Sequence, residues 1–407
     1  MRYRYSQLDR DNLSWFTEDM SKASLSQIDL RQGKLRGLNL FSMPFSYPIT
    51  VIAVPNGSGK STILAMAACA FHNEKKGFRL RERRQSYYTF SDFFIQSSEE
   101  VPPEGVQIWY RIRYNKWKKS PRVPDGIGNH WQKQEKKQGR KWSHYANRVD
   151  RNVVFLGIQR VVPPSEKSVA KTYRNYFIDG EKAGWEDAVA GVVGRILGTP
   201  YENFRMKAHG KYRLPIVTSR GQIYSGFNMG AGENALFEIF FTIYATPPGT
   251  LLVVDEIELG LHESAQRRLV NELKLLCKKR QIQVICTTHS PAILSAVPPE
   301  GRFFLQSFDI KTIITPGISP QYAAGQLSAR KSNELDIFVE DRVASQTLES
   351  AIPLEVRRRI NIIPIGSPAA IVRQMAARQK ERRQAECLAV MDGDQASELP
   401  RLQGGAS

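Results

Sequence analysis

The sequence has few cysteines and no long apolar run, and these absences exclude several classes of protein. Its four cysteines are widely separated and lack metal-ligand spacing, so neither a disulfide framework nor a zinc site is indicated. We therefore expect reduced thiols in the core or at the surface. No stretch approaches 18 uncharged apolar residues, and the N-terminus lacks the apolar segment of a signal peptide. We expect a cytoplasmic protein that is not secreted and does not cross a membrane.

Acidic residues are also scarce relative to basic ones. The 407 residues include 58 Lys and Arg against 40 Asp and Glu, which gives a formal net charge of +18. This excess favours a polyanionic partner, DNA or another nucleic acid, although solvated Lys and Arg side chains are an alternative explanation. With 41% hydrophobic and 10% aromatic residues, the chain has an ordinary globular composition and can form two or three domains.

A glycine-rich loop between an apolar run at 49–53 and a helix-like run at 63–68 is the strongest local signal. This order brings backbone N–H groups and a helix N-terminus to one point, which suits a phosphate group. Lys60 can reach the β- and γ-phosphates of a nucleotide, and the Ser61 hydroxyl can bind Mg²⁺. Val54 stands where this P-loop pattern usually has glycine, and we expect a backbone conflict there. The predicted nucleotide-binding residues of the loop are Asn56, Gly57, Ser58, Gly59, Lys60, Ser61 and Thr62.

Two later apolar runs end in further catalytic candidates. The run 251–254 precedes Asp255 and Glu256, of which the first can hold Mg²⁺ opposite Ser61 and the second can polarise a water for attack on the γ-phosphate. The run 283–288 precedes His289, which can contact the γ-phosphate or the attacking water. Polar strand ends with only a structural role are the alternative interpretation.

Two weaker signals complete the predicted nucleotide site. The apolar run from 152 is expected to end as a strand at Gln159, which could ligate Mg²⁺, position the attacking water or simply end the strand. A loop of small residues with Gly230, Gly232 and Glu233 precedes an expected helix over 236–242. Its backbone N–H groups could form a second phosphate clamp, or an ordinary helix cap.

A basic segment interrupts these motifs. Residues 73–152 carry 19 Lys and Arg against 9 Asp and Glu, interleaved with aromatic residues. We expect an inserted β-rich lobe with a strand over 106–114 and a mobile cationic loop over 116–141. Phosphate contact with base stacking is one explanation of this composition, and a solvated loop beside a small aromatic core is the other.

The C-terminal part predicts three parallel strands, over 334–340, 360–366 and 388–391, with two helices between them. The carboxyl ends of parallel strands meet at one edge, so Glu340, Asp392 and Asp394 are expected to lie together. Carboxylates are ligands for Mg²⁺ or Mn²⁺, and metal-assisted cleavage of a phosphodiester would follow. Acidic strand ends without a metal are the alternative.

The motifs taken together resemble those of the ATP-binding-cassette (ABC) ATPases over about residues 30–300. The P-loop, the small-residue loop, the Asp255–Glu256 pair and His289 are similar, in order, to the Walker A, signature, Walker B and switch-histidine motifs. Within that family the chain resembles the branch of SMC-like proteins and OLD (overcoming lysogenization defect) nucleases. The resemblance implies ATP and Mg²⁺ as cofactors and a homodimer or higher homo-oligomer in which Gly232 and Glu233 face the nucleotide of a second subunit. Gly230 stands where the signature usually has serine.

The C-terminal acids resemble the first part of the Toprim domain that OLD-type nucleases carry behind their ATPase. The resemblance rests on Glu340, Asp392 and Asp394, with Gly366 at the intervening turn. Only 13 residues follow Asp394, fewer than the remaining Toprim elements need, so we expect this domain to be incomplete.

We therefore predict an α/β protein of three parts. These are an ABC-type ATPase head at 1–72 and 152–325, a basic inserted lobe at 73–151 and a partial Toprim-like βαβ domain at 326–407. The resemblance implies an ATPase coupled to a DNA nuclease, as in bacterial anti-phage defence. The competing hypothesis is a nucleotide-gated sensor or scaffold ATPase with a degenerate Toprim domain that binds DNA or holds a separate effector protein or toxin. An SMC-like repair ATPase fits less well, because the insertion lacks the heptads of a coiled coil.

Overall fold

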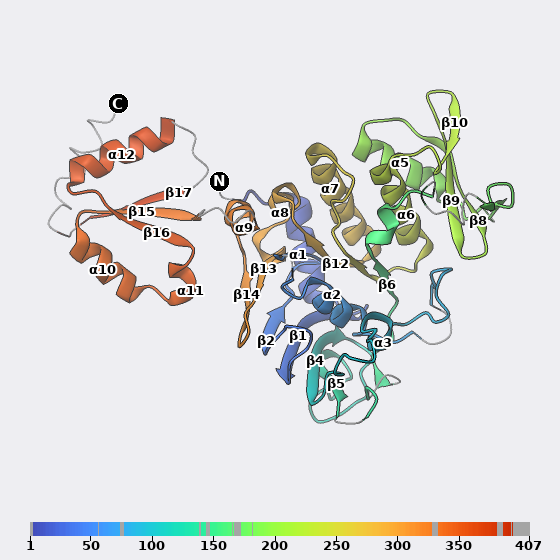
Figure 1. Cartoon of the computed structure of the whole chain (residues 1–407), viewed down its shortest axis with the longest axis horizontal. Helices are drawn as coiled ribbons and strands as arrows, with labels where there is room; N and C mark the ends of the chain where they lie inside the picture. The colour runs from blue at the N-terminus through green and yellow to red at the C-terminus, as the bar shows by residue number, and fades with distance from the viewer. Residues whose placement is uncertain are drawn as a thin grey trace. The chain divides into compact units, whose positions relative to one another are not determined.

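The computed structural model describes residues 3–55, 57–73, 77–137, 140–143, 147–164, 166, 172–180, 182–327, 333–380, 386–391 and 393. The chain divides into two compact units, Arg4–Gly317 and Ile318–Ser407, the second together with the first three residues (Figure 1). Each unit is described by itself. Within the described residues, no helix is long and apolar enough to span a membrane.

A six-stranded sheet lies at the centre of the larger unit, and five of its strands are parallel. In spatial order the strands are β14 (Thr312–Pro316), β13 (Arg302–Ser307), β3 (Ile49–Ala53), β12 (Gln283–Thr288), β11 (Leu251–Val254) and β6 (Val153–Leu156). Strands β3, β11 and β12 are buried along their whole length, as the apolar runs predict for parallel strands covered on both faces.

The register of this sheet brings the predicted motifs to one edge. Strand β12 lies between β3 and β11, with Thr288 opposite Ala53 and Cys286 opposite Val254. Because all three strands run in the same direction, the glycine loop after β3, the acidic pair after β11 and His289 after β12 leave the sheet at its carboxyl edge. That edge is where open α/β sheets place their ligand sites.

A second, antiparallel sheet contains much of the basic segment. Its order is β2 (Phe41–Pro44), β1 (Ser24–Gln32), β4 (Val106–Tyr114) and β5 (Gly128–Lys136). Strand β4 lies where the sequence predicts it. The expectation of a loop over 116–141 is wrong for 128–136, because β5 pairs with β4 along nine residues. Its buried Gln134 and partly buried Gln132 replaced the alternating apolar residues by which a strand is recognised.

Helix α2 (Lys60–Ala68) joins the two sheets. It packs on β11 and β12 of the central sheet, and its buried residues share one core with β1 and β4. The basic segment also satisfies the carbonyl groups at the helix end, since Tyr110 donates to Met66 O, and Gln134 and Arg148 donate to Cys69 O. The segment 106–148 is thus bonded to the helix that begins at the P-loop.

Helices and a third sheet complete the larger unit. Helix α1 (Gln7–Glu18) begins with a capping box that joins Ser6 and Asp9. Helix α1 packs on α7, and α5 packs on α6, α7 and β8. The remaining elements are α3 (Phe90–Phe93), η2 (Ile158–Val161), β7 (Ile178–Asp179), α5 (Glu186–Leu197), β8 (Glu202–His209), β9 (Tyr212–Ser219), β10 (Gln222–Ser225), α6 (Ala231–Ala245), α7 (Glu263–Arg280), α8 (Pro291–Ala296) and η3 (Pro299–Gly301).

The smaller unit contains a three-stranded parallel sheet of order β16-β15-β17. This arrangement matches the predicted alternation of strands and helices. Its elements are α9 (Pro320–Leu327), β15 (Leu335–Val339), α10 (Arg342–Ala351), α11 (Leu354–Arg357), β16 (Ile360–Pro364), α12 (Pro368–Lys380) and β17 (Glu386–Val390).

Candidate active site

The glycine loop has a backbone that only glycine adopts easily at two positions. Gly57 and Gly59 have φ angles of +79° and +91°, a region that side chains with a Cβ disfavour. A Cβ at Gly59 would also lie 2.4 Å from Leu38 Cδ2. Helix α2 begins directly after Gly59, so its first N–H groups face the loop. Asn56, another predicted contact of the loop, lies outside the described residues.

The expected backbone conflict at Val54 is absent. Val54 is fully buried in the core and is not among the described non-glycine residues with positive φ. A β-branched residue is therefore compatible with this position, and its side chain serves as packing. The expectation failed because this position does not need a positive φ, and the Val54 side chain packs in the hydrophobic core.

The hydroxyl residues that follow Lys60 point to different environments. Ser61 is exposed, whereas Thr62 is buried with 4% of its surface accessible. Ser61 is thus available as a Mg²⁺ ligand, and Thr62 packs inside the helix–sheet interface. Of the two, only Ser61 lies where solvent or a ligand reaches it.

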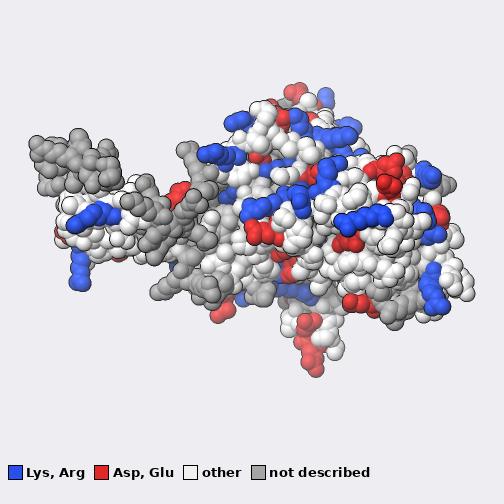
Figure 2. Space-filling model, turned by 90° about the horizontal axis from the view of Figure 1, so that it is seen from above, with Lys and Arg blue, Asp and Glu red and all other residues white. Residues whose placement is uncertain are grey.

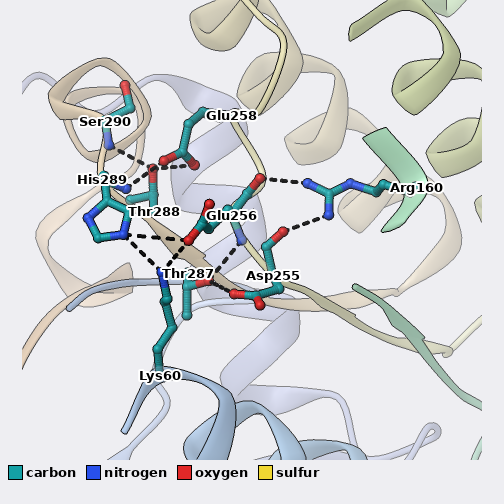
Figure 3. A network of polar contacts seen from close by, with 9 residues as sticks. All are labelled: Lys60, Arg160, Asp255, Glu256, Glu258, Thr287, Thr288, His289 and Ser290. Carbon is teal, nitrogen blue, oxygen red and sulfur yellow. Dashed lines mark hydrogen bonds and ion pairs between the residues drawn. The ribbon is translucent and has the colours of Figure 1, made fainter. Parts of the chain in front are cut away.

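Three predicted residues from separate parts of the chain meet at the sheet edge (Figure 3). The Lys60 ammonium forms an ion pair with the Glu256 carboxylate, and its Nζ lies 3.0 Å from His289 Nε2. His289 Nε2 lies 3.7 Å from the nearer Glu256 oxygen. The P-loop lysine, the acid after β11 and the histidine after β12 therefore form one cluster, as the parallel register requires.

The turn that carries Asp255 and Glu256 is held by a residue that the sequence did not single out. Thr287 Oγ1 donates a hydrogen bond of 2.7 Å to Asp255 Oδ1 and accepts one of 2.9 Å from the Glu256 N–H. Glu256 has a φ of +46°, which is uncommon for a residue with a side chain. One hydroxyl thus fixes both the carboxylate of Asp255 and the unusual backbone of Glu256.

A neighbouring acid, Glu258, holds the main chain at His289. Glu258 accepts hydrogen bonds from the Thr288 hydroxyl at 2.7 Å and from the His289 N–H at 2.6 Å. Ser290 caps α8 and its N–H bonds to Thr288 Oγ1. Thr287 and Thr288 therefore connect the end of β12 to the acidic turn. Two hydroxyl residues directly before His289 are the sequence signal that could have predicted this contact.

Gln159 does not end a strand. Strand β6 stops at Leu156, and Gln159 lies exposed in the 3₁₀ turn η2. The next residue, Arg160, is buried and donates hydrogen bonds of 2.6 Å to the main-chain oxygens of both Asp255 and Glu256. The sequence signal was correct about the segment, but the residue in contact with the acidic turn is Arg160.

The small-residue loop leads into a helix that begins earlier than expected. Helix α6 starts at Ala231, with Gly230 as its N-cap, so Gly232 and Glu233 belong to its first turn and not to a loop. A Cβ on Gly232 would lie 2.1 Å from Gly260 O, so close packing against the turn after Glu256 requires glycine. The small residues hid the helix start, because glycine is unfavourable inside helices.

Within the chain, Glu233 already has hydrogen-bond partners. The Tyr224 hydroxyl donates to Glu233 Oε1 at 2.7 Å. Burial and the bond to Glu233 raise the pKa of Tyr224 to about 12, and burial and Glu233 also raise the pKa of Tyr201. The two tyrosines thus remain neutral donors that fix the Glu233 carboxylate at the start of α6.

The C-terminal acids are described only in part. Glu340 follows β15, which pairs in parallel with β17 so that Val339 lies opposite Val390. Glu340 therefore leaves the sheet at the same edge as the segment after β17. Asp392 and Asp394 lie outside the described residues. Within the described residues, no group of three His, Cys, Asp or Glu could hold a metal ion.

A pocket in the larger unit lies away from these residues. It measures about 540 Å³ and lies between the start of α5 and β8, with Trp185, Phe204 and Arg205 in its lining. None of the predicted site residues lines it. Phosphate-binding loops are open backbone cradles, so pocket size does not locate the site here.

A family model matches part of the larger unit. Residues 216–295 match the family described as "AAA domain, putative AbiEii toxin, Type IV TA system". That region contains α6, the acidic turn and His289, but not the P-loop. No curated protein sequence matches the chain.

Similar solved structures include heads of SMC proteins. The SMC head domain from Thermotoga maritima is 15% identical, with a TM-score of 0.38, 72% of this chain covered and 98% of that one. An Smc head bound to the C-terminal domain of ScpA, derived from Pyrococcus furiosus, is 12% identical, with a TM-score of 0.43 and coverages of 75% and 99%. An SMC head bound to the C-winged helix domain of ScpA is 17% identical, with a TM-score of 0.40 and coverages of 72% and 97%.

The fold and the site define the class of the larger unit. A parallel sheet with a glycine loop between β3 and α2, acids after β11 and the matched ATPase-domain sequence at 216–295 describe an α/β P-loop ATPase domain. The particular role of this chain within that class is a matter of proposal.

Proposed function

We propose that the larger unit binds ATP with Mg²⁺ and hydrolyses the bond between its β- and γ-phosphates. The observation that carries this proposal is the convergence of Lys60, Glu256 and His289 at one sheet edge. A lysine, a carboxylate and an imidazole are the groups that phosphoryl transfer to water needs, for charge neutralisation, water activation and γ-phosphate contact respectively.

Each side chain would have a distinct part in hydrolysis. The backbone N–H groups at the start of α2 bind phosphate oxygens, and Lys60 leaves its ion pair with Glu256 to neutralise the β- and γ-phosphates. Glu256, released from the lysine, accepts a proton from the attacking water. Glu258 accepts a hydrogen bond from the main-chain N–H of His289. The His289 imidazole hydrogen-bonds the γ-phosphate or that water.

The residues present fit a magnesium ion. The exposed Ser61 hydroxyl and the Asp255 carboxylate are hard oxygen ligands of the kind that Mg²⁺ prefers. The ion, when bound, would neutralise charge on the β- and γ-phosphates. The hydrogen bond from Thr287 fixes the orientation of the Asp255 carboxylate, so Asp255 would be preorganised as a Mg²⁺ ligand.

Replacement of Lys60 tests the assignment directly. We expect Lys60→Ala to abolish nucleotide binding and hydrolysis, because Lys60 is the described Lys or Arg side chain that pairs with the Glu256 carboxylate and lies beside His289. Lys34→Ala is the control, since Lys34 is exposed and its ammonium donates to the Asp309 carbonyl oxygen. Equal ATP turnover in the two variants would refute the assignment of Lys60.

We also propose that ATP brings two copies of the chain together. Support comes from the start of α6, where Gly230, Gly232 and Glu233 form a helix N-terminus next to the turn after Glu256. Helix N-termini favour anions, so a phosphate of a second subunit is a suitable partner. Sedimentation of the chain with and without ATP measures this; a monomer under both conditions would contradict it.

DNA is the partner that we propose for the cationic surface. Figure 2 shows Lys and Arg side chains spread over the visible face, with Asp and Glu among them. Contacts of this kind release counterions, so affinity should fall steeply with salt. Replacing six lysines by glutamine should weaken binding and flatten that slope, whereas an unchanged slope would show that they are only solvated. The six are Lys116, Lys118, Lys119, Lys136, Lys137 and Lys141.

The smaller unit is proposed to act as a Toprim-like nuclease in an OLD-like defence protein of the cytoplasm. The parallel pairing of β15 with β17, which places Glu340 and the start of the 391–394 segment at one edge, supports this. Nicking of supercoiled DNA should need Mg²⁺ or Mn²⁺ and should vanish in Asp392→Ala while ATP hydrolysis remains.

The alternative function is a nucleotide-gated sensor or scaffold that holds a separate effector or toxin. The description of the matched family names a toxin of a toxin–antitoxin system, and this supports the alternative function. The two functions differ in one observation. No nicking and no bound metal, with full biological activity in Asp392→Ala, would support the sensor and contradict the nuclease.

A further inference from the structure

Arg160 occupies a buried position behind the acidic turn (Figure 3). Its Nη1 donates to Asp255 O and its Nη2 to Glu256 O, both at 2.6 Å, so the guanidinium spans two consecutive carbonyl groups. Nη1 also donates to Gly157 O at 3.0 Å, on the turn after β6. Arg160 thus ties the end of β6 to the turn after β11.

This position is costly for a cation unless its contacts are specific. Burial lowers the pKa of Arg160 to about 10, against nearby acids that raise it, so the group is still charged at neutral pH. Buried charges persist when hydrogen bonds replace water. Here the replacement consists of main-chain oxygens, and two of these belong to the residues predicted to carry out the chemistry.

The turn that Arg160 holds is conformationally unfavourable by itself. The left-handed region is unfavourable for a residue with a side chain, and Glu256 lies there with φ +46°. In this conformation the Glu256 carboxylate lies beside Lys60 and His289. Its N–H is fixed by Thr287 and its carbonyl by Arg160, so the residue is held from both sides.

We propose that Arg160 is a positioning residue for Glu256, which it keeps in the left-handed conformation that aims the carboxylate at the attacking water. The inference rests on the proposed ATP hydrolysis and deepens it. Since Arg160 contacts the acidic turn and not the glycine loop, it acts on turnover and leaves nucleotide affinity to Lys60 and the α2 N-terminus.

Lysine cannot replace arginine in this role. The planar guanidinium presents several donors in a fixed fork, whereas an ammonium group is a single point of charge. Arg160→Lys keeps the charge and most of the volume but cannot bond Asp255 O and Glu256 O with two separate nitrogens. The variant therefore isolates the geometry from the charge.

Arg151→Lys is the matched control. Arg151 precedes β6 at the opposite edge of the same sheet, where Nε donates to Gly249 O and Nη1 to Gln283 Oε1, each at 2.8 Å. It is also buried, and burial lowers its pKa to about 9. Both variants lose a fork of buried hydrogen bonds, but only Arg160→Lys releases the acidic turn.

The first test separates kcat from KM. We expect Arg160→Lys to lower kcat about 100-fold, the order found for loss of a general base, with KM and the Kd of a fluorescent ATP analogue within about threefold of wild type. In a Glu256→Gln background, Arg160→Lys should have little further effect, because both changes remove the same function. A wild-type kcat, equal losses in the two lysine variants or an additive double variant would overturn the inference.

A second readout does not need activity. In Arg160→Lys, amide hydrogen exchange of the peptide with Glu256, Ile257 and Leu259 should be faster than in Arg151→Lys, because the turn loses its hold. Unchanged exchange would refute the positioning role even if the wild-type chain hydrolysed no ATP. Absent wild-type hydrolysis, by contrast, would refute the proposed function alone.

Discussion

Two buried threonine hydroxyl groups in the central sheet, those of Thr287 and Thr50, differ in their hydrogen bonding. Thr287 donates to Asp255 and accepts from the Glu256 N–H, whereas the buried Thr50 hydroxyl of β3 has no partner among the described residues. A hydroxyl with two hydrogen bonds in a buried site stabilises, and one with none costs free energy. The same side chain therefore has opposite effects on two strands of one sheet.

Replacing each threonine by valine tests this contrast. Thr287→Val should lower the free energy of unfolding by about 1–2 kcal/mol, since the Glu256 N–H loses its acceptor, and should slow ATP turnover. Thr50→Val should be neutral or stabilising, because it removes an unsatisfied hydroxyl. Urea denaturation of both variants measures this, and equal destabilisation of the two would contradict the account.

Val54 gives a second prediction for a single residue. Because Val54 is buried and has no strained backbone, Val54→Gly should create a cavity and lower the free energy of unfolding by roughly 2–3 kcal/mol. Nucleotide affinity of the folded variant should stay near the wild-type value. Tighter nucleotide binding without a loss of stability would show that glycine is the preferred residue here.

Sequence patterns predicted that Lys60, Glu256 and His289 converge, but they did not predict the residues that support them. Lys60, Asp255, Glu256 and His289 each follow a strongly apolar run, so chain order and strand direction predict that they meet. Arg160 and Thr287 act through the main chain, and their partners become apparent only when strands β6, β11 and β12 are placed side by side. Side chains that bond to main-chain atoms leave no pattern of spacing in the sequence.

At the scale of elements, α1 is attached to α7 by a buried ion pair. Lys274 Nζ lies 2.7 Å from Asp9 Oδ1, and the two side chains are 5% and 2% exposed. The Tyr47 hydroxyl donates to the same oxygen at 3.0 Å. Burial raises the pKa of Asp9, but the hydrogen bonds from Lys274 and Ser6 outweigh it, so the pKa is lower than 3.8.

This pair predicts a loss of stability in acid. A carboxylate whose pKa is lowered in the folded state stabilises it above the unfolded-state pKa, and that contribution disappears as the pH falls through the folded-state value. Burial lowers the pKa of Lys274 as well, with Asp9 opposing, but lysine titrates far above this range, so of this pair only Asp9 contributes to the loss of stability in acid. Stability should therefore decline below about pH 4.

Asp9→Asn should weaken this acid dependence and, by leaving Lys274 buried without its carboxylate, lower the free energy of unfolding by roughly 3 kcal/mol. Asp11→Asn, at an exposed pair with Lys278 on the same two helices, is the control and should change little. Denaturation between pH 3 and 7 measures both. An unaltered acid limb in Asp9→Asn would contradict the assignment.

Elements with regular apolar patterns were predicted closely, and polar ones were not. Strands β11, β12 and β15 lie within a residue or two of the expected ranges. Strand β5 was missed because Gln132 and Gln134 serve carbonyl groups of the α2 end, and α1 was missed although its Ser6–Asp9 capping box is visible in the sequence. Polar residues with tertiary partners do not show the periodicity of their element.

For the whole molecule, we propose that Glu256 activates water in an ATP-dependent cycle. Glu256→Gln removes the base but retains the shape, so ATP should bind with Mg²⁺ as in the wild type. Its ion pair with Lys60 is lost as well, and this should favour and not hinder phosphate binding.

The most direct measurement is steady-state ATP hydrolysis by Glu256→Gln, with ATP binding and sedimentation measured on the same preparation. Glu263→Gln, at an exposed i,i+4 pair on α7, is the control. We predict turnover at least about 100-fold below wild type, with retained binding and a nucleotide-bound dimer that accumulates. Wild-type turnover in Glu256→Gln, with the control unchanged, would contradict the account.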